Sequence, residues 1–575
     1  MESKMVLEAA VKAVTIQNST NLFLYVVGAD CYKEESFYNW LVQKLPGYML
    51  PKGIVKLDKL PLTIHGKVDK SKLPEWKPAQ HDSYLSFTKE ENLLLTICNE
   101  LLPDGMDITV DTNFYALGGD SIKAIQISSR ILEYGYELKV SDILTNPVFR
   151  EMAKHIIKKQ VPLENEMIMN KPFTGLPIIQ WFFNQHFAEP QQYNQSLVLR
   201  LKHNIDVHIL EKALSSMVIH HDSLRINVIQ ENNQLFYNNI HLERSVKIHE
   251  IKVIGQGWKN IEHVIWDSID VSFNLEKELL FRTYLIHANE EKYLLFIFHH
   301  LIIDGVSWQI FLHDLRLLLD DNGSGRQSLP NKTISYAKYS KEYHVSYIET
   351  ETFVSKMPAS IPEYERTITL ATYGDRTILQ KTLWRENSQN LIEKANSLYG
   401  TKTHELFVMS LMLVLSDHMN KTQAAFEIEL HGRDLLHNID VSRTIGWFTK
   451  IQTVILSISP KELSEQLADM KKQLYHNALK NNNLTHNEIR INYLGDLPET
   501  NNSHWIFESF NWNRDVSPYN LWPYYMEANI YRLDGNLHII AAFNNEWSKQ
   551  GEKIIACWLE KLEFITRHCI EYKNI

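Results

Sequence analysis

The first candidates for chemistry are two adjacent histidines, His299 and His300, which precede Asp304 and Gly305. Imidazole is the side chain that most often transfers protons in enzymes. The apolar run 293–298 predicts a buried strand, so one imidazole should face a cleft while the other packs. The two rings diverge and no third ligand is spaced nearby, so we expect no metal. The alternative to a catalytic role is that both histidines are buried in the core and satisfied by hydrogen bonds.

A second candidate is Ser121, which ends the segment 111–121, Asp-Thr-Asn-Phe-Tyr-Ala-Leu-Gly-Gly-Asp-Ser. The two glycines predict a tight turn, and apolar residues recur at helical spacing from Ile122 onward. Ser121 should therefore lie at a helix N-terminus with an exposed hydroxyl and backbone N–H groups nearby. That position suits attachment of a phosphate-linked arm, although a plain helix cap would also explain a serine.

The rest of the chain must position these residues. A proline-marked stretch ends near residue 78, a polar linker follows, and a compact helix-rich unit spans 88–160. From residue 172 to the end there is no clear break. That length suits two lobes, which we divide into 172–350 and 351–575. The two histidines lie where the predicted strand turns into a helix that ends around residue 321.

Composition and charge limit the possible functions. The chain has 575 residues, of which 44% are hydrophobic and 22% charged, with a formal net charge of −10. This is globular composition without a basic block, so we expect two to four domains and no binding of nucleic acid or membranes. We expect no signal sequence and no membrane span. The four cysteines form no CxxC pair, which predicts free thiols in a reducing cytoplasm.

The segment that ends at Ser121 resembles the signature of peptidyl carrier proteins, in which the serine receives 4′-phosphopantetheine. That family usually shows LGGHS or LGGDS, and Asp120 matches the variant often found before epimerisation domains. The resemblance implies a four-helix carrier bundle and a phosphopantetheinyl transferase as partner. Phosphopantetheine on Ser121 is the only prosthetic group that it implies.

The segment 172–575 resembles the condensation and epimerisation domains of nonribosomal peptide synthetases, which have the chloramphenicol acetyltransferase fold. Both branches share the HHxxxDG pattern, and in that family the second histidine, here His300, serves the active site. The aspartate, here Asp304, is structural and held by an arginine, for which we expect Arg443. His299 and Gly305 are expected to be structural. Further motifs of the family match 176–183, 193–196 and 220–225, the last of which we interpret as mostly structural.

One motif carries the expected catalytic carboxylate. Residues 427–434, Glu-Ile-Glu-Leu-His-Gly-Arg-Asp, resemble the epimerisation motif EGHGRE, which assigns that carboxylate to Glu429. Leu430 replaces the usual glycine, and a larger side chain there could crowd the site. The alternative interpretation is that Glu429 is a structural carboxylate on a strand, held in a salt bridge.

Two more motifs favour epimerisation over condensation. Residues 443–449, RTIGWFT, match the epimerisation pattern RTVGWFT, where condensation domains more often show GxFVNT. Residues 491–495, INYLG, resemble the epimerisation motif FNYLG. From these matches we expect Trp447 and Asn492 to support the site. Tyr493 is expected to be a third catalytic hydrogen-bond donor.

Residues 1–78 resemble the C-terminal subdomain of adenylation domains through the segments 44–51, KLPGYMLP, and 60–69, LPLTIHGKVD. The lysine that contacts substrate in that family would be Lys67. The large ATP-binding subdomain is missing, so we expect Lys67 to be idle. We also expect the chain to be part of a larger synthetase with the adenylation core upstream.

Together the resemblances imply a multidomain α+β protein. It would contain a small α+β subdomain, a four-helix carrier bundle and a two-lobed chloramphenicol-acetyltransferase-like α/β epimerisation domain. The expected activity converts an aminoacyl or peptidyl thioester from L to D at Cα, with protons carried by His300 and Glu429. Which of the two is acid and which is base stays open. The expected downstream partner is a D-selective condensation domain, and the expected oligomeric state is monomeric.

Three alternatives remain beside this reading. A condensation domain would form amide bonds with the same histidine motif. A carrier joined to an inactive epimerase-like scaffold would serve docking only. A free acyltransferase of the same fold would not need Ser121.

Overall fold

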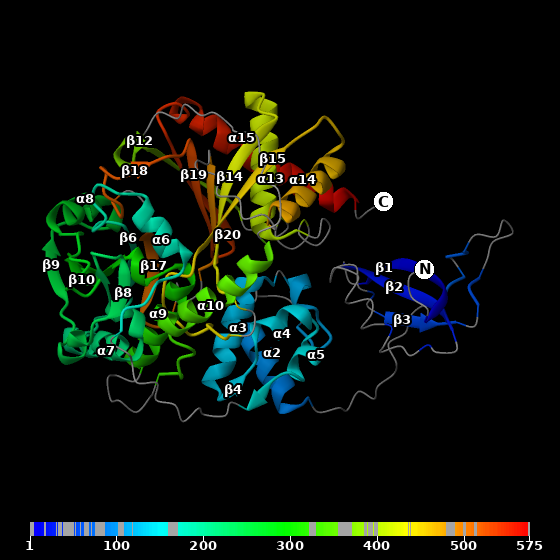
Figure 1. Cartoon of the computed structure of the whole chain (residues 1–575), viewed down its shortest axis with the longest axis horizontal. Coiled ribbons are helices and arrows are strands. Elements are labelled where there is room, and N and C mark those ends of the chain that lie inside the picture. The colour runs from blue at the N-terminus through cyan, green and yellow to red at the C-terminus, as the bar shows by residue number, and fades with distance from the viewer. Residues whose placement is uncertain are drawn as a thin grey trace. The chain divides into compact units, whose positions relative to one another are not determined.

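The computed structural model describes most of the chain, and Figure 1 shows the order of its elements. The described residues are 5–16, 19–29, 32, 37, 51, 53–57, 59–61, 68–70, 72–74, 87–101, 108–117, 119–158, 171–320, 329–354, 371–384, 388, 391, 395, 401–434, 436, 439–478, 489–497, 502–510 and 514–572. The chain separates into two compact units, Met1–Asn92 with Arg567–Ile575 and Leu93–Thr566.

The first unit is built on a three-stranded sheet in the order β1-β2-β3. The strands are β1 (Val6–Ile16), β2 (Ser19–Gly28) and β3 (Gly53–Lys56). The middle strand is buried on both faces, because Phe23 and Tyr25 lie in one apolar cluster and Leu24 and Val26 in another. The assignment of this unit to an adenylation-type subdomain stays a prediction. Lys67 lies outside the described residues.

The segment 89–158 is a small helical bundle around one apolar core. Its elements are α2 (Lys89–Leu101), η2 (Phe114–Leu117), α3 (Ser121–Glu133), β4 (Tyr136–Glu137), α4 (Val140–Thr145), α5 (Phe149–Ala153) and β5 (Ile157–Lys158). The core side chains are Leu94, Ile97, Phe114, Ile127, Ile131, Ile143, Phe149 and Met152. Asp120 caps α3 by accepting a hydrogen bond from the backbone N–H of Lys123 at 2.9 Å. Ser121 is therefore the first residue of a helix, as the sequence predicts.

The rest of the second unit contains two lobes, each built on a mixed sheet (Figure 1). The first sheet has the order β17-β6-β11-β10-β9. Up to α10, the elements are α6 (Pro177–Asn184), β6 (Asn194–Leu201), α7 (Val207–His220), η3 (Asp222–Arg225), β7 (Ile226–Ile229), β8 (Gln234–Tyr237), η4 (Asn239–Glu243), β9 (His249–Val253), α8 (Trp258–Ser268), β10 (Phe281–Ala288), β11 (Glu291–His299), η5 (His300–Ile302), α9 (Gly305–Asp320) and α10 (Tyr336–Val354). The central strand β11 is buried from Tyr293 onward, which explains its uninterrupted apolar run.

The second lobe carries a six-stranded sheet in the order β13-β20-β19-β16-β14-β15. The remaining elements of the chain are β12 (Ala371–Thr372), η6 (Tyr373–Asp375), β13 (Thr377–Leu383), α13 (Thr403–Met419), β14 (Gln423–Leu430), β15 (Lys450–Ser457), α14 (Leu463–Ala478), β16 (Ile489–Asp496), β17 (Trp505–Phe510), β18 (Leu521–Trp522), β19 (Met526–Leu533), β20 (Asn536–Phe543) and α15 (Ser548–Tyr572). Strands β14, β16 and β19 are parallel neighbours, so their carboxyl ends meet at one edge of the sheet.

The two lobes are not consecutive in the sequence. Strand β17 follows four strands of the second sheet along the chain, yet it pairs antiparallel with β6 in the first sheet. The boundary expected at residue 350 therefore separates the two sheets except for β17, which lies after that residue but belongs to the first sheet. Just before β6, Tyr193 forms a bridge with Val516, which lies in the segment after β17.

Two further expectations concern the surroundings of the protein. None of the helices in the described part of the chain is both long and apolar enough to cross a lipid bilayer. Cys98 and Cys557 are free thiols, in agreement with the prediction for these two of the four cysteines. The cytoplasmic location stays a prediction.

Candidate active site

The paired histidines have separate environments. His299 is fully buried; its Nδ1 accepts the N–H of Leu301 at 3.2 Å, so its Nε2–H donates to the carbonyl of Pro190 at 2.9 Å. Burial lowers the pKa of His299 to about 3, which keeps the ring neutral. His300 lies one residue further, where the strand has ended and the short η5 turn begins. His299 therefore packs while His300 lines a cavity.

The hydrogen bonds of His300 determine its tautomer. Its Nδ1 lies 2.8 Å from the carbonyl oxygen of Ile303, so the hydrogen is on Nδ1. Its Nε2 lies 2.8 Å from the amide nitrogen of Gln195, whose oxygen accepts the indole N–H of Trp308, also at 2.8 Å. The ring stacks on Trp447, with 4.2 Å between centroids. Burial lowers the pKa of His300 to about 4, so the ring is neutral and Nε2 presents a lone pair.

The aspartate of the histidine motif is held by a different arginine from the one expected. Asp304 pairs with Arg433 at 3.0 Å and accepts the backbone N–H groups of Ser307 and Phe448 at 2.7 and 3.0 Å. The expectation that Arg443 holds Asp304 is wrong. The guanidinium of Arg443 instead pairs with Asp314 on α9. Asp304 thereby joins the start of α9 to the turn after β14 and fixes the loop that carries His300.

A glycine in the turn after β14 is sterically required. Gly432 has φ +62°, and an added Cβ would lie 1.8 Å from the carbonyl oxygen of Phe448. Only glycine fits against the neighbouring chain in this conformation. Around this turn, three side chains point in different directions. Glu429 faces the cavity, His431 contacts Ser121, and Arg433 pairs with Asp304.

Glu429 lies at the end of β14 beside Arg490 of β16. The shortest distance between the carboxylate and the guanidinium is 3.5 Å, and the Glu429 side chain is 16% exposed. Arg490 also pairs with Glu427 at 3.3 Å, and the hydroxyl of Tyr524 donates to Glu427 at 2.6 Å. Burial raises the pKa of Glu429 to about 7, with Arg490 opposing that rise. Both protonation states of Glu429 are thus populated near neutral pH.

His300 and Glu429 line one cavity, which encloses about 1200 Å³ of space including its opening. Both lobes contribute to its wall, which includes Gln195, Gly305, Gln309, Tyr373, Glu429, Arg490, Asn492, Leu494, Phe510, Asp515 and Glu527. Leu430 is not among the lining residues, because neighbouring strand residues point to opposite faces. The larger side chain therefore does not crowd the cavity in the described part of the chain.

Tyr493 does not lie with the other predicted site residues. Asn492 and Leu494 line the cavity, whereas the Tyr493 ring packs against Phe407 of α13, with 5.4 Å between centroids. Burial, with the nearby Asp496 carboxylate, holds the pKa of Tyr493 far above its usual range. The expected role of Tyr493 as a third donor at the reacting carbon has no support in this arrangement. Trp447 is placed against His300, as expected for a supporting residue.

Three residues that line the cavity were missed by sequence reasoning. Gln195 lies inside the recognised segment 193–196, but nothing in that segment shows that it contacts His300. Arg490 stands one residue before INYLG and becomes a neighbour of Glu429 only through strand pairing. Asp515 lines the cavity and accepts the backbone N–H of Ser196 at 3.2 Å. Burial raises the pKa of Asp515 to about 8, and no local pattern marks it.

The carrier bundle contacts the large domain around Ser121. The Ser121 hydroxyl oxygen lies 3.0 Å from Nε2 of His431. Four further contacts surround it: Lys123 with Asp496 at 3.2 Å, Gln126 with Gln309 at 2.6 Å, Glu133 with His313 at 2.8 Å, and Ser129 with Arg443 at 3.2 Å. Ile125 of the carrier is buried in the apolar core of the large domain. Gln309 also lines the cavity, so the contact between the carrier and the large domain reaches the cavity wall.

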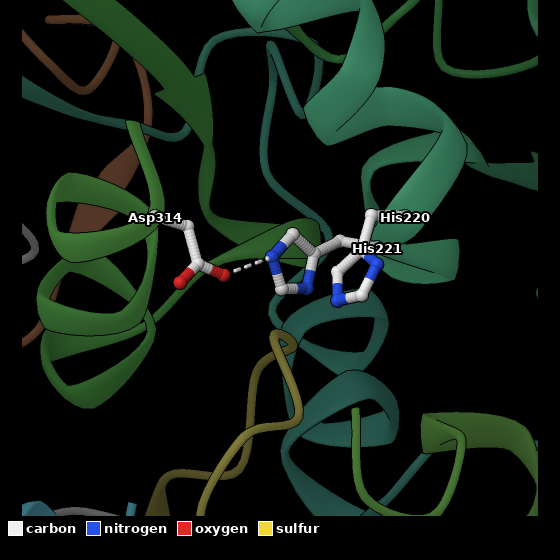
Figure 2. A group of neighbouring side chains, drawn as sticks. All are labelled: His220, His221 and Asp314. Carbon is white, nitrogen blue, oxygen red and sulfur yellow. Dashed lines mark hydrogen bonds and ion pairs between the residues drawn. The ribbon is translucent and has the colours of Figure 1, made fainter. Parts of the chain in front are cut away.

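Among the described residues, one group of possible metal ligands lies outside this site, and Figure 2 shows its members, His220, His221 and Asp314. His221 forms a hydrogen bond with Asp314 at 2.8 Å, and Arg443 pairs with the other carboxylate oxygen. A guanidinium on a carboxylate opposes binding of a second cation there. The group therefore links α7 to α9 and to the segment that carries Arg443.

Two lobes built on mixed sheets, with a cavity lined by both and a helical bundle in contact with them, define the chloramphenicol-acetyltransferase-like class of fold. The chain belongs to the condensation domain family, which matches residues 174–573, and it includes a phosphopantetheine attachment site at residues 92–156. It is thus a carrier domain followed by a condensation-family domain of the nonribosomal peptide synthetase type. The second match confirms 4′-phosphopantetheine as the expected cofactor.

Known proteins with similar sequences are peptide synthetases. Bacitracin synthase 3 of Bacillus licheniformis is 28% identical over 96% of this chain and 9% of its own length. Gramicidin S synthase 1 of Brevibacillus brevis is 27% identical over 92% of this chain and 52% of its own length. The chain thus spans only part of each of these two relatives, about a tenth of the first and about half of the second.

Solved structures share the fold of the large domain. The epimerization domain from the third module of tyrocidine synthetase B superposes with a TM-score of 0.60 at 21% identity, covering 71% of this chain and 100% of that one. The condensation domain of the Monacolin K polyketide synthase MokA superposes with a TM-score of 0.55 at 9% identity, covering 69% and 97%. Both show the chloramphenicol-acetyltransferase-like architecture expected from the sequence.

Proposed function

We propose that this protein epimerises the α-carbon of an aminoacyl or peptidyl thioester held on Ser121. The observation that carries the proposal is the pairing of a neutral imidazole, His300, with a carboxyl group of near-neutral pKa, Glu429, on the wall of one cavity. Removal and return of a proton next to a carbonyl needs one group that accepts and another that donates. The cavity supplies both.

Phosphopantetheine on Ser121 would supply a thioester, whose carbonyl acidifies the neighbouring C–H bond. The residues of the chain fit the arm. Ser121 is the first residue of α3, and Gln309 is shared between the carrier contact and the cavity wall. Tethering raises the local concentration of the substrate without tight binding.

The tautomer of His300 supports one division of the two roles. Nε2 carries a lone pair, so His300 is the proton acceptor in the resting state, and Gln195 must release it when substrate enters. Glu429, with a pKa of about 7, is the matching donor in its acid form. After one turnover His300 holds a proton and Glu429 is ionised, which is the pair needed for the reverse direction.

Arg490 is placed to stabilise negative charge in the cavity. It lines the wall and lies 3.5 Å from Glu429 and 3.3 Å from Glu427. Negative charge that develops on the substrate carbonyl oxygen would be held more strongly in this buried setting than in water. Arg490 also favours the ionised form of Glu429, so it opposes the effect of burial on that group.

Amide-bond formation is the second candidate, because the histidine motif belongs to both branches of the family. That reaction removes a proton from an amine and has no step that needs a cavity carboxyl group with a pKa near 7. The cavity contains such a group in Glu429. Epimerisation therefore accounts for more of the observed side chains.

The test is a deuterium-exchange assay on the loaded chain. Ser121 is loaded with an L-aminoacyl-pantetheine by a promiscuous transferase, the protein is incubated in deuterium oxide, and the released amino acid is analysed for α-deuterium and chirality. Deuterium and the D-isomer should both accumulate. Glu429→Gln and His300→Ala should each abolish that accumulation. Glu508→Gln and His287→Ala, partly exposed positions in the first sheet, serve as matched controls and should retain it.

Failure to incorporate deuterium with several L-aminoacyl groups and a dipeptide would contradict the proposal. Formation of a peptide from a supplied acceptor, without exchange, would instead support condensation. If epimerisation holds, a D-selective condensation domain is the expected consumer of the product. The adenylation core that supplies the amino acid is expected upstream.

A further inference from the structure

His431 makes a defined contact with the carrier that the proposed proton transfers do not use. The backbone N–H of Arg433 donates to its Nδ1 at 3.1 Å. A neutral imidazole has one hydrogen, which must therefore be on Nε2. That atom lies 3.0 Å from the Ser121 hydroxyl oxygen, so Nε2–H is the donor and the serine oxygen is the acceptor.

The position of this donor is set by the surrounding chain. Gly432, with its positive φ, turns the backbone immediately after His431. The Arg433 N–H that fixes the ring belongs to the residue whose guanidinium pairs with Asp304. Burial lowers the pKa of His431, with Arg433 acting in the same direction and Asp434 and Asp120 opposing it. His431 is thus a neutral hydrogen-bond donor directed at the attachment oxygen.

We propose that His431 binds the phosphodiester that joins pantetheine to Ser121, and thereby favours docking of the carrier that bears its arm. The proposal deepens the function above and rests on attachment at Ser121. A donor within hydrogen-bond distance of the serine oxygen lies next to any phosphate esterified to that oxygen. N–H groups in the first turn of α3 offer the same phosphate further donors, as helix N-termini do for anions.

Other nearby groups are already engaged. The Lys123 ammonium is buried and pairs with Asp496 at 3.2 Å across the interface. Asp496 is shared with Arg532. Gln126 is bound to Gln309. None of these contacts involves the Ser121 oxygen, whereas the contact of His431 would change from a neutral hydroxyl to an anion when the arm is attached. A hydrogen bond to a charged group is stronger than one between neutral groups.

The experiment observes the phosphate and the docking separately, in the full chain without any substrate loaded. Phosphorus NMR reports the environment of the phosphodiester. The δ1-methyl group of Ile122, which lies against Gly495 of the large domain, reports the docked population in a methyl-labelled sample. The chain is compared before and after attachment of pantetheine, as wild type and as His431→Ala, His431→Gln and the control His287→Ala.

We expect attachment of pantetheine to raise the docking equilibrium constant about tenfold in wild type and in His287→Ala. His431→Ala should remove most of that gain and move the phosphorus resonance toward its value in a free carrier. His431→Gln, which retains an N–H donor, should recover part of both effects.

Equal phosphorus shifts in wild type and His431→Ala, with Ile122 still docked, would overturn the proposal. An unchanged docked population on attachment of the arm would also overturn it. Because no substrate is present, neither result depends on epimerisation. A chain that shows the expected shifts but incorporates no deuterium would contradict only the proposed function.

Discussion

Burial acts in opposite directions on the two residues proposed to carry protons. It disfavours the charged form of each group, so it lowers the pKa of His300 to about 4 and raises that of Glu429 to about 7. The result near neutral pH is an uncharged base that shares a cavity with a carboxyl group protonated in part of the population. Such a pair can begin proton transfer without first changing the net charge of the cavity.

The raised pKa of Glu429 predicts a pH-dependent cost in stability. The folded chain holds this proton more tightly than the unfolded chain, so stability is lost as pH rises from about 4.5 through about 7. Glu429→Gln cannot ionise and should raise the free energy of unfolding by about 1 to 3 kcal/mol at pH 8, with little effect at pH 4. Denaturant unfolding at both pH values measures this. A stabilisation as large at pH 4 as at pH 8 would contradict the assignment, and Glu508→Gln is the control.

The buried pair of Asp304 and Arg433 predicts a large structural effect. Both side chains are nearly inaccessible, so loss of one leaves an uncompensated buried charge. Arg433→Met should lower the free energy of unfolding by about 3 to 5 kcal/mol. The double variant Asp304→Asn/Arg433→Met should recover part of that loss. Denaturant unfolding of Arg433→Met, Asp304→Asn and the double variant measures the coupling free energy between the two side chains. Additive effects would show that the pair is not coupled.

At the scale of elements, β14 and the turn after it organise the site. Pairing with β16 brings Arg490 beside Glu429, and pairing with β15 brings Lys450 opposite Leu430. Strand alternation directs Glu429 into the cavity and Leu430 away from it. The Gly432 turn then reverses the chain so that the next residues contact the carrier and Asp304.

This arrangement predicts that the leucine in the motif has little effect on catalysis. Leu430→Gly should change the rate of α-deuteration by less than about twofold, because the side chain lies outside the cavity. It should lower the free energy of unfolding by about 1 kcal/mol, since glycine weakens a strand interior. The exchange assay and thermal unfolding measure the two effects. A rate increase of tenfold or more would show that Leu430 does obstruct the site.

At the scale of the whole second unit, the cavity depends on contacts between distant segments. The wall combines residues of β6, α9, β14, β16 and β19, and β17 ties the two lobes together. The carrier adds a third component, because Ile125 is buried in the large core and Gln126 contacts Gln309. The carrier contact and the cavity wall therefore share Gln309.

The ion pair at that interface predicts a loss of coupling on substitution. Lys123 is buried and pairs with Asp496. Lys123→Ala should slow formation of the D-isomer about tenfold or more, because Asp496 keeps Arg532 but loses its ion pair across the interface, and docking weakens. The Ile122 methyl signal should move toward its undocked position in parallel. Lys154→Ala, at an exposed carrier lysine that pairs within the carrier, is the control and should leave both readings unchanged.

The sequence by itself determined the elements and the main candidates. The apolar run before His299 predicts the buried strand β11, and the glycines before Ser121 predict the start of α3. Both are local patterns, since strand burial and helix starts depend on neighbouring residues. The motifs also identified His300 and Glu429 as partners, and the structure places both on one cavity.

Only the tertiary structure decided which side chains meet. Arg433, not Arg443, holds Asp304, and Tyr493 packs on Phe407 away from the cavity. Strand register, the direction of one glycine turn and the docking of a separate domain determine these contacts, and none is encoded in the spacing of nearby residues. The pKa values of the site follow for the same reason, because burial arises from segments hundreds of residues apart that close over the cavity.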